Sequence, residues 1–131
     1  MLTYDQIWQT FLDNYKASNI DIPQDDERIY QCIHNAVLLF NNRMRKQVVC
    51  EDITEMVNGE LTYDDLLIIS HYIRLVFLNN DRTFFEKLYQ PFAADVGVRN
   101  FNTQLNSLKT SIEQQKDFIE TLILNSMEEF L

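Results

Sequence analysis

The amino-acid sequence predicts an all-α protein, a small helical bundle that ends in a long C-terminal helix. Turn-forming residues are scarce: two glycines and two prolines occur among 131 residues, which disfavours a fold rich in hairpins. From Phe101 to Phe130 there is neither glycine nor proline, and a helix of that length would extend about 40 Å. With 46% hydrophobic residues, the chain is long enough to form one apolar core.

We expect a single domain over residues 1–131, with the bundle in residues 1–100 and the extended helix in residues 101–131. That helix is longer than a core of this size needs, so it is a candidate docking element. Apolar residues recur along it at the spacing of one helix face. The residues expected at an interface with a partner or a second copy are Phe101, Leu105, Leu108, Ile112, Ile119, Leu122, Met127, Phe130 and Leu131.

Two polar residues stand at positions where apolar ones are expected. Gln115 falls on the apolar seam of the last helix, where a polar residue can set the register of helix pairing. Packing on the protein's own core would need no such device, so the sequence favours a helix that self-associates or clasps a partner, although polar residues also occur in cores by chance. Arg74 lies inside an apolar segment and is expected to form an internal ion pair, with an interface contact as the alternative.

Capping patterns predict where the earlier helices begin. Thr3 followed by Gln6 forms a capping box for the first helix, and the acidic residues 25–27 open the second. Thr62 with Asp65 caps a third helix that is apolar around nearly its whole circumference. That helix is expected at the centre of the bundle; the alternative is that part of it meets another subunit.

The remaining segments are expected to be connectors and two further helix starts. Residues 47–50 could form a very short strand, but no partner strand is evident, so an extended connector is expected there. Residues 53–57 are expected to form a helical turn. Asp81 caps another helix, which ends or kinks near Gln90 because Pro91 breaks the pattern. Asn102 or Thr103 caps the last helix.

Charge is distributed unevenly along the chain. The formal net charge is −9, which disfavours non-specific binding to nucleic acid. Helix capping and solvation are the favoured explanation for an acidic segment between residues 47 and 73 that has no lysine or arginine. The alternatives are a divalent-cation site, although the spacing does not match an EF-hand, and a negative surface facing a basic partner or a DNA channel. The acids are Glu51, Asp52, Glu55, Glu60, Asp64 and Asp65.

The sequence contains no motif for catalysis, metal binding or a cofactor. His34 and His71 lie far apart and outside any zinc-binding spacing, and Cys32 and Cys50 form no CxxC pair. We therefore expect no catalytic residue, no metal ligand, no cofactor and a reduced intracellular setting. The apolar stretch from Leu66 to Leu78 is too short to span a bilayer, so no membrane segment is expected.

Five segments carry a resemblance to a known family. They are Thr62–Leu67 (TYDDLL), His71–Arg74 (HYIR), Gln90–Phe92 (QPF), Val96–Phe101 (VGVRNF) and Gln104–Leu108 (QLNSL). Over roughly residues 60–130 the chain resembles the small head-to-tail connector proteins, also called adaptor or neck proteins, of tailed bacteriophages.

The resemblance implies a structural subunit of a ring, commonly of twelve copies, that docks beneath the portal protein and carries the next neck or tail component. It implies a location in the virion neck, after synthesis in the host cytoplasm, and a channel through which DNA passes without specific binding. The helix from Phe101 onward, or the tail from Met127 to Leu131, would dock on the portal or a neighbouring subunit. The candidate channel-facing acids are Glu51, Asp52, Glu55 and Glu60.

Two other functions remain open. One is a soluble helical regulatory module that binds a protein partner one-to-one. The other is a helical enzyme whose site is assembled from Tyr, Asp and His side chains.

Overall fold

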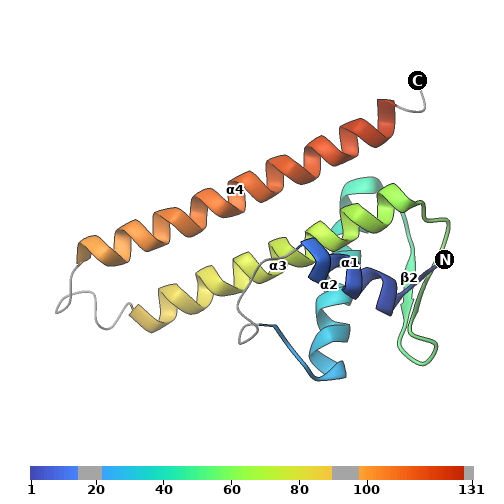
Figure 1. Cartoon of the computed structure of the whole chain (residues 1–131), viewed down its shortest axis with the longest axis horizontal. Coiled ribbons are helices and arrows are strands. Elements are labelled where there is room, and N and C mark those ends of the chain that lie inside the picture. The colour runs from blue at the N-terminus through green and yellow to red at the C-terminus, as the bar shows by residue number, and fades with distance from the viewer. Residues whose placement is uncertain (15–21, 90–97, 129–131) are drawn as a thin grey trace.

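A computed structural model describes residues 1–14, 22–89 and 98–128, and the side chains within them except at 84, 85, 87–89, 98–102 and 128. The predicted small, mostly helical fold with a long C-terminal helix is confirmed (Figure 1). A short three-stranded sheet, which was not predicted, accompanies the helices. In chain order the elements are β1 (Leu2–Thr3), α1 (Tyr4–Asn14), α2 (Asp26–Met44), β2 (Val49–Glu51), β3 (Met56–Asn58), α3 (Tyr63–Tyr89) and α4 (Val98–Glu128).

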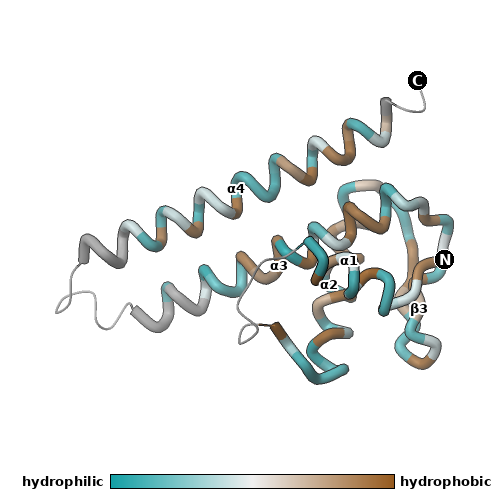
Figure 2. Tube along the Cα trace, viewed as in Figure 1, coloured by the Kyte–Doolittle hydropathy of each residue, from teal (hydrophilic) through white to brown (hydrophobic). Residues whose placement is uncertain are grey.

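Helix α3 is the centre of the fold, as the sequence predicted. It packs against α1, α2 and α4, and the 31-residue α4 returns alongside it, so that the two long helices form an extended pair (Figure 1). The shorter helices α1 and α2 gather near the N-terminal half of α3, next to the sheet. Hydrophobic segments of the trace concentrate where these elements meet (Figure 2).

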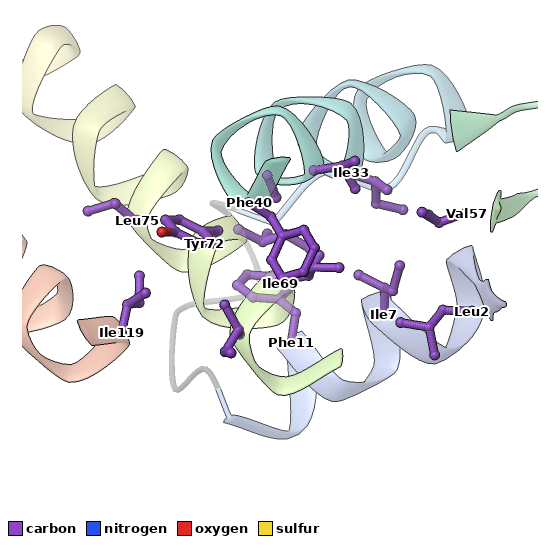
Figure 3. Packing of buried hydrophobic residues seen from close by; sticks show 14 of the residues in the cluster. Leu2, Ile7, Phe11, Ile33, Phe40, Val57, Ile69, Tyr72, Leu75 and Ile119 are labelled. Atoms are coloured by element: carbon purple, nitrogen blue, oxygen red, sulfur yellow. The ribbon is translucent and has the colours of Figure 1, made fainter. Parts of the chain in front are cut away.

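The core is built from side chains contributed by every helix (Figure 3). Ile7 of α1, Ile33 of α2 and Ile69 of α3 are fully buried. The rings of Phe11 and Phe77 stack with centroids 5.4 Å apart, which joins α1 to α3. Each fully buried aliphatic or aromatic side chain contributes roughly 1.5–3 kcal/mol through removal from water. The core therefore couples elements that are distant in sequence.

Both predicted capping boxes are present. The Thr3 amide donates to Gln6 Oε1 at 2.9 Å, and the Gln6 amide donates to Thr3 Oγ1 at 3.1 Å. The Thr62 amide likewise donates to Asp65 Oδ2 at 3.0 Å, and the Asp65 amide donates to Thr62 Oγ1 at 3.2 Å. The Lys46 ammonium reaches the same Asp65 oxygen at 3.2 Å. Reciprocal hydrogen bonds of this kind satisfy backbone donors that a helix start leaves open.

The segment between α2 and α3 differs from the prediction. Residues 49–51 form strand β2, residues 52–55 form a turn, and residues 56–58 form β3, so the expected helical turn over 53–57 is wrong. The sheet order is β1-β3-β2 with antiparallel pairs, and Val57 lies opposite both Leu2 and Cys50. Val57 is fully buried. Pairing with the distant N-terminus and burial of Val57 together outweigh the local helical tendency.

Two predicted helix boundaries are also wrong. Asp81 does not begin a helix, because α3 runs without interruption from Tyr63 to Tyr89, where neither glycine nor proline interrupts it. Helix α4 already begins at Val98, so neither Asn102 nor Thr103 is its cap. The predicted break at Pro91 lies outside the described residues.

Gly59 provides a test of the connection from β3 to α3. Its φ is +146°, and a Cβ placed there would lie 2.5 Å from Val48 Cγ1 and 3.2 Å from Val48 Cβ. We expect Gly59→Ala to lower the free energy of unfolding by about 1–3 kcal/mol, because it adds backbone strain and a clash with a buried valine. Urea unfolding measures this. As a control, Glu60→Ala at the neighbouring exposed site should change the free energy of unfolding by no more than about 0.5 kcal/mol. A Gly59→Ala variant as stable as the wild type would contradict the prediction.

Candidate functional site

The acidic turn between β2 and β3 is held against α1 and α2 by aromatic and histidine side chains. Asp52 Oδ1 accepts a hydrogen bond from the Tyr4 hydroxyl at 2.7 Å and lies 2.6 Å from His34 Nε2. These two contacts lower the pKa of Asp52, the one from Tyr4 more than the one from His34. The Tyr30 hydroxyl donates to the Glu55 carboxylate, which raises the pKa of Tyr30 to about 12. Two of the four candidate channel-facing acids thus anchor the turn to the helices.

This cluster contains the Tyr, His and Asp side chains from which an enzyme site could be assembled. Tyr4 is 2% exposed, and burial together with the hydrogen bond to Asp52 raises the pKa of its phenol far above the usual range. Its hydroxyl therefore stays protonated at neutral pH and serves as a donor to Asp52, not as a base. The ring of Tyr30 meets that of Tyr4 edge-on at 5.1 Å. The contacts of Tyr4, His34 and Tyr30 hold the turn in place.

The other acids of this segment divide into two groups. Asp65 is buried in the capping box of α3, and Asp64 lies exposed in the first turn of the same helix, where the helix dipole favours a negative charge. Glu51 and Glu60 are exposed, and Glu51 accepts a hydrogen bond from Thr54 Oγ1 at 3.2 Å. The predicted capping role is therefore confirmed for Asp65. Glu51, Glu60 and Asp64 present their carboxylates to solvent.

The predicted interface seam of α4 faces α3 along its middle. Ile112 is 2% exposed and Ile119 is 1% exposed, and both belong to the chain's own core. Leu105, Leu108 and Leu122 are half-buried, whereas Met127 is exposed. The side chain of Phe101, and Phe130 and Leu131, lie outside the described residues. Because α4 packs on α3, only part of the predicted interface is exposed to a partner.

Gln115 joins α4 to α3 through His71. It is 4% exposed, and its Nε2 donates to the His71 carbonyl oxygen at 3.0 Å and lies 3.1 Å from His71 Nδ1. Burial, and then the positive charge of Arg74, lower the pKa of His71, so the ring stays neutral and Nδ1 can accept from the amide. The polar residue in the seam therefore serves packing within the chain.

An ion pair fastens the other side of α4. Arg43 Nε and Nη2 donate to the two carboxylate oxygens of Glu120 at 2.9 Å and 2.8 Å. This bidentate pair lowers the pKa of Glu120 and raises that of Arg43. It links the C-terminal end of α2 to α4.

Several apolar side chains are exposed, and all of the following except Met127 were absent from the predicted interface. Phe118, Leu124 and Met127 of α4 are 46%, 56% and 46% exposed, Leu38 of α2 is 67% exposed, and Ile53 at the turn of the hairpin is completely exposed. Phe118 and Leu124 do not fit the seam periodicity, and that departure is the signal that could have identified them. Residues of this kind, when they gather on one surface, mark places where a protein contacts a partner.

Within the described ranges, no His, Cys, Asp or Glu side chains form a group of three or more that could hold a metal ion. In that same part of the chain, no helix combines the length and apolarity needed to cross a membrane.

The fold and these surfaces define a small, mostly helical protein in which a long two-helix pair extends from a compact bundle. The chain belongs to the YomZ prophage protein family, whose family model it matches over residues 1–128. It is 54% identical, over 131 residues and the full length of both chains, to the SPbeta prophage-derived uncharacterized protein YomZ of Bacillus subtilis (strain 168). No solved structure matches the chain. Its origin is therefore a bacteriophage carried as a prophage.

The burial of His71, together with the positive charge of Arg74, predicts a pH dependence of stability. Since the pKa of His71 is lowered in the folded protein, the unfolded chain binds a proton below about pH 6.5 that the folded chain does not. Stability is therefore complete above that pH and declines as the pH falls, by at most about 1.4 kcal/mol per pH unit for this group. Urea unfolding between about pH 7 and pH 5.5, above the range of the carboxylates, should show this decline.

The variant His71→Asn keeps an oxygen acceptor for Gln115 but does not titrate. We expect its free energy of unfolding to change less with pH over this range than that of the wild type. An unchanged slope in the variant would show that another group causes the decline.

Proposed function

We propose that the chain is a non-enzymatic structural subunit of a phage head-tail connector ring. In this role it docks beneath the portal protein, extends the DNA channel and offers an attachment surface to the next neck or tail component. We propose twelve subunits per ring and no cofactor. The protein would be made in the host cytoplasm and would lie in the neck between capsid and tail. Membership of a prophage protein family and the resemblance over residues 60–130 support the phage setting.

The observation that carries the proposal is the long α3–α4 pair. Helix α4 has 31 residues, and its N-terminal part extends well past the bundle formed by α1 and α2 (Figure 1). Its C-terminal end still presents Leu124 and Met127 to solvent. An elongated subunit with apolar side chains at one end suits an assembly in which neighbouring proteins contact it at separate places.

Charge supports the same role. The net charge of −9 and the exposed carboxylates of Glu60 and Asp64 give a surface that repels nucleic acid. Such a surface would let DNA pass without binding to it. Asp52 and Glu55 are less suited to line a channel, because Tyr4, His34 and Tyr30 already hold them.

The decisive experiment locates the chain in particles. After induction of the lysogen that carries this gene, purified particles would be labelled with a gold-conjugated antibody against the chain and viewed by electron microscopy. We expect label at the one vertex that joins head and tail. Absence from particles, with recovery of the chain in a one-to-one complex with another protein, would replace the connector by the regulatory module.

A second experiment tests the docking end of α4. Leu124→Lys with Met127→Lys adds charge at two exposed apolar positions, so the monomer should keep its helical circular dichroism and its unfolding midpoint. We expect the double variant to be lost from particles, because buried lysines without partners oppose docking. Leu38→Lys, the same kind of change at an exposed leucine of α2, is the matched control and should be incorporated. Normal incorporation of the double variant would exclude this end as the docking surface.

A further inference from the structure

One flank of α4 is free of charged side chains and borders a hollow. Between residues 103 and 127, Lys109, Glu113, Lys116 and Glu120 lie on the opposite side of the helix, and Asp117 lies at the edge of the flank, next to Gln114 and Thr121. The uncharged flank follows steps of three and four residues, which keep its members on one face. These are Ser107, Ser111, Gln114, Phe118, Thr121 and Asn125.

The hollow lies between this flank and α3, has a volume of about 310 Å³ and contains a single charged side chain, that of Arg74. Phe118 forms part of its wall, is 46% exposed, and packs edge-on against the ring of His71 at 4.7 Å. None of the residues that line it is acidic. The cores of protein interfaces are depleted in charged residues and enriched in aromatic residues and arginine, which is the composition found here.

The turn of the β-hairpin has the complementary composition. Ile53 is completely exposed at its tip, and the exposed carboxylate of Glu51 lies two residues away. The segment from residue 47 to residue 73 contains acids and no lysine or arginine. The tip thus offers an aliphatic side chain and a negative charge, whereas the hollow offers an aromatic wall and a guanidinium.

We propose that the hairpin turn of one copy docks in the α3–α4 hollow of a second copy, with Ile53 against Phe118 and the Glu51 carboxylate on Arg74. A guanidinium carries five donors, so Arg74 can receive this carboxylate in addition to its contacts within the chain. The turn cannot reach the hollow of its own chain while Tyr4, His34 and Tyr30 hold it on α1 and α2. The contact is therefore made between copies.

Because the two surfaces of this contact differ, each copy can donate one turn and accept another. A contact of this head-to-tail kind closes into a ring when the rotation between copies allows it, and otherwise continues as a filament. The inference rests on the proposed function, since it names the interface between neighbouring subunits of the connector ring. It assigns Glu51 to that interface and not to the channel wall.

Disulfide crosslinking tests the contact directly. In a background without native cysteines, Cys32→Ser with Cys50→Ser, the chain would carry Ile53→Cys at the tip and Gln114→Cys at the exposed rim of the hollow. Mild oxidation, applied to the purified chain and to particles from the induced lysogen, should give a ladder of dimers, trimers and larger species. The matched control carries Ile53→Cys with Lys116→Cys in place of Gln114→Cys. Residue 116 lies two positions after residue 114 and faces the opposite side of α4, so this control should give no ladder.

Charge reversal tests the pairing of Glu51 with Arg74. Glu51→Arg or Arg74→Glu should each lower the ladder yield at least about tenfold, and the two together should restore it. Glu60→Arg, a reversal of another exposed acid, should leave the yield unchanged. Circular dichroism of each variant separates loss of the contact from loss of folding, and the cysteine pair tests the contact even where Arg74→Glu fails to fold.

The outcomes for the contact and for the connector role are separable. If the chain with Ile53→Cys as its single cysteine dimerises as efficiently as the chain with both cysteines, the contact is a symmetric one between two tips and the inference is overturned. Absence of a ladder from both the free chain and neck-located particles would overturn it while leaving the connector role intact. A ladder from a chain that never enters particles would support the contact and reject the connector.

Discussion

The packing of three helices on α3 is the constraint on which the rest of the structure depends. Ile68, Ile69 and Ile73 are fully buried, and α1, α2 and α4 each cover part of the helix. A helix that is apolar on nearly every side cannot remain in water, and its neighbours have too little apolar surface to form a core without it. The sheet reaches the same core through Val57 and Leu2 (Figure 3). Helix α3 therefore positions the flank of α4 directly, and it positions the hairpin turn through α1 and α2, which hold that turn.

The parts of the fold that the sequence predicts are those with local causes. A capping box needs residues three apart, so the starts of α1 at Thr3 and of α3 at Thr62 could be found without a structure. The hairpin could not, because its strands have three residues each and β3 pairs with the N-terminus. Its turn also places Glu55 at a φ of 54°, where glycine or asparagine is usual. Tertiary contacts hold that conformation: the Tyr4 amide donates to the Glu55 carbonyl oxygen at 2.8 Å.

The candidate site was predictable only in part, for a related reason. Periodicity identifies which residues of α4 form an apolar seam, but a helix pair within one chain and a helix pair between two chains produce the same pattern. Gln115 was expected to favour a helix that self-associates or clasps a partner, but its amide donates to the carbonyl oxygen of His71 in the same chain. Ile112 and Ile119 accordingly lie in the core. Phe118 interrupts the periodicity, and its surroundings become apparent only when α3 and α4 are placed side by side.

The anchoring of the acidic turn bears on how it could act in an assembly. A free loop with an exposed isoleucine would lose conformational entropy on docking and would reduce the affinity of any contact it made. Here two hydroxyl donors and a histidine already fix the carboxylates of Asp52 and Glu55. Asp52 and Glu55 therefore hold the turn in place, and Ile53 and Glu51 stay exposed to solvent. The orientation of these two side chains is set by the contacts of the turn with α1 and α2. Because ring closure depends on the rotation between neighbours, a fixed angle is the property that a ring subunit requires, whereas a one-to-one binder has no need of it.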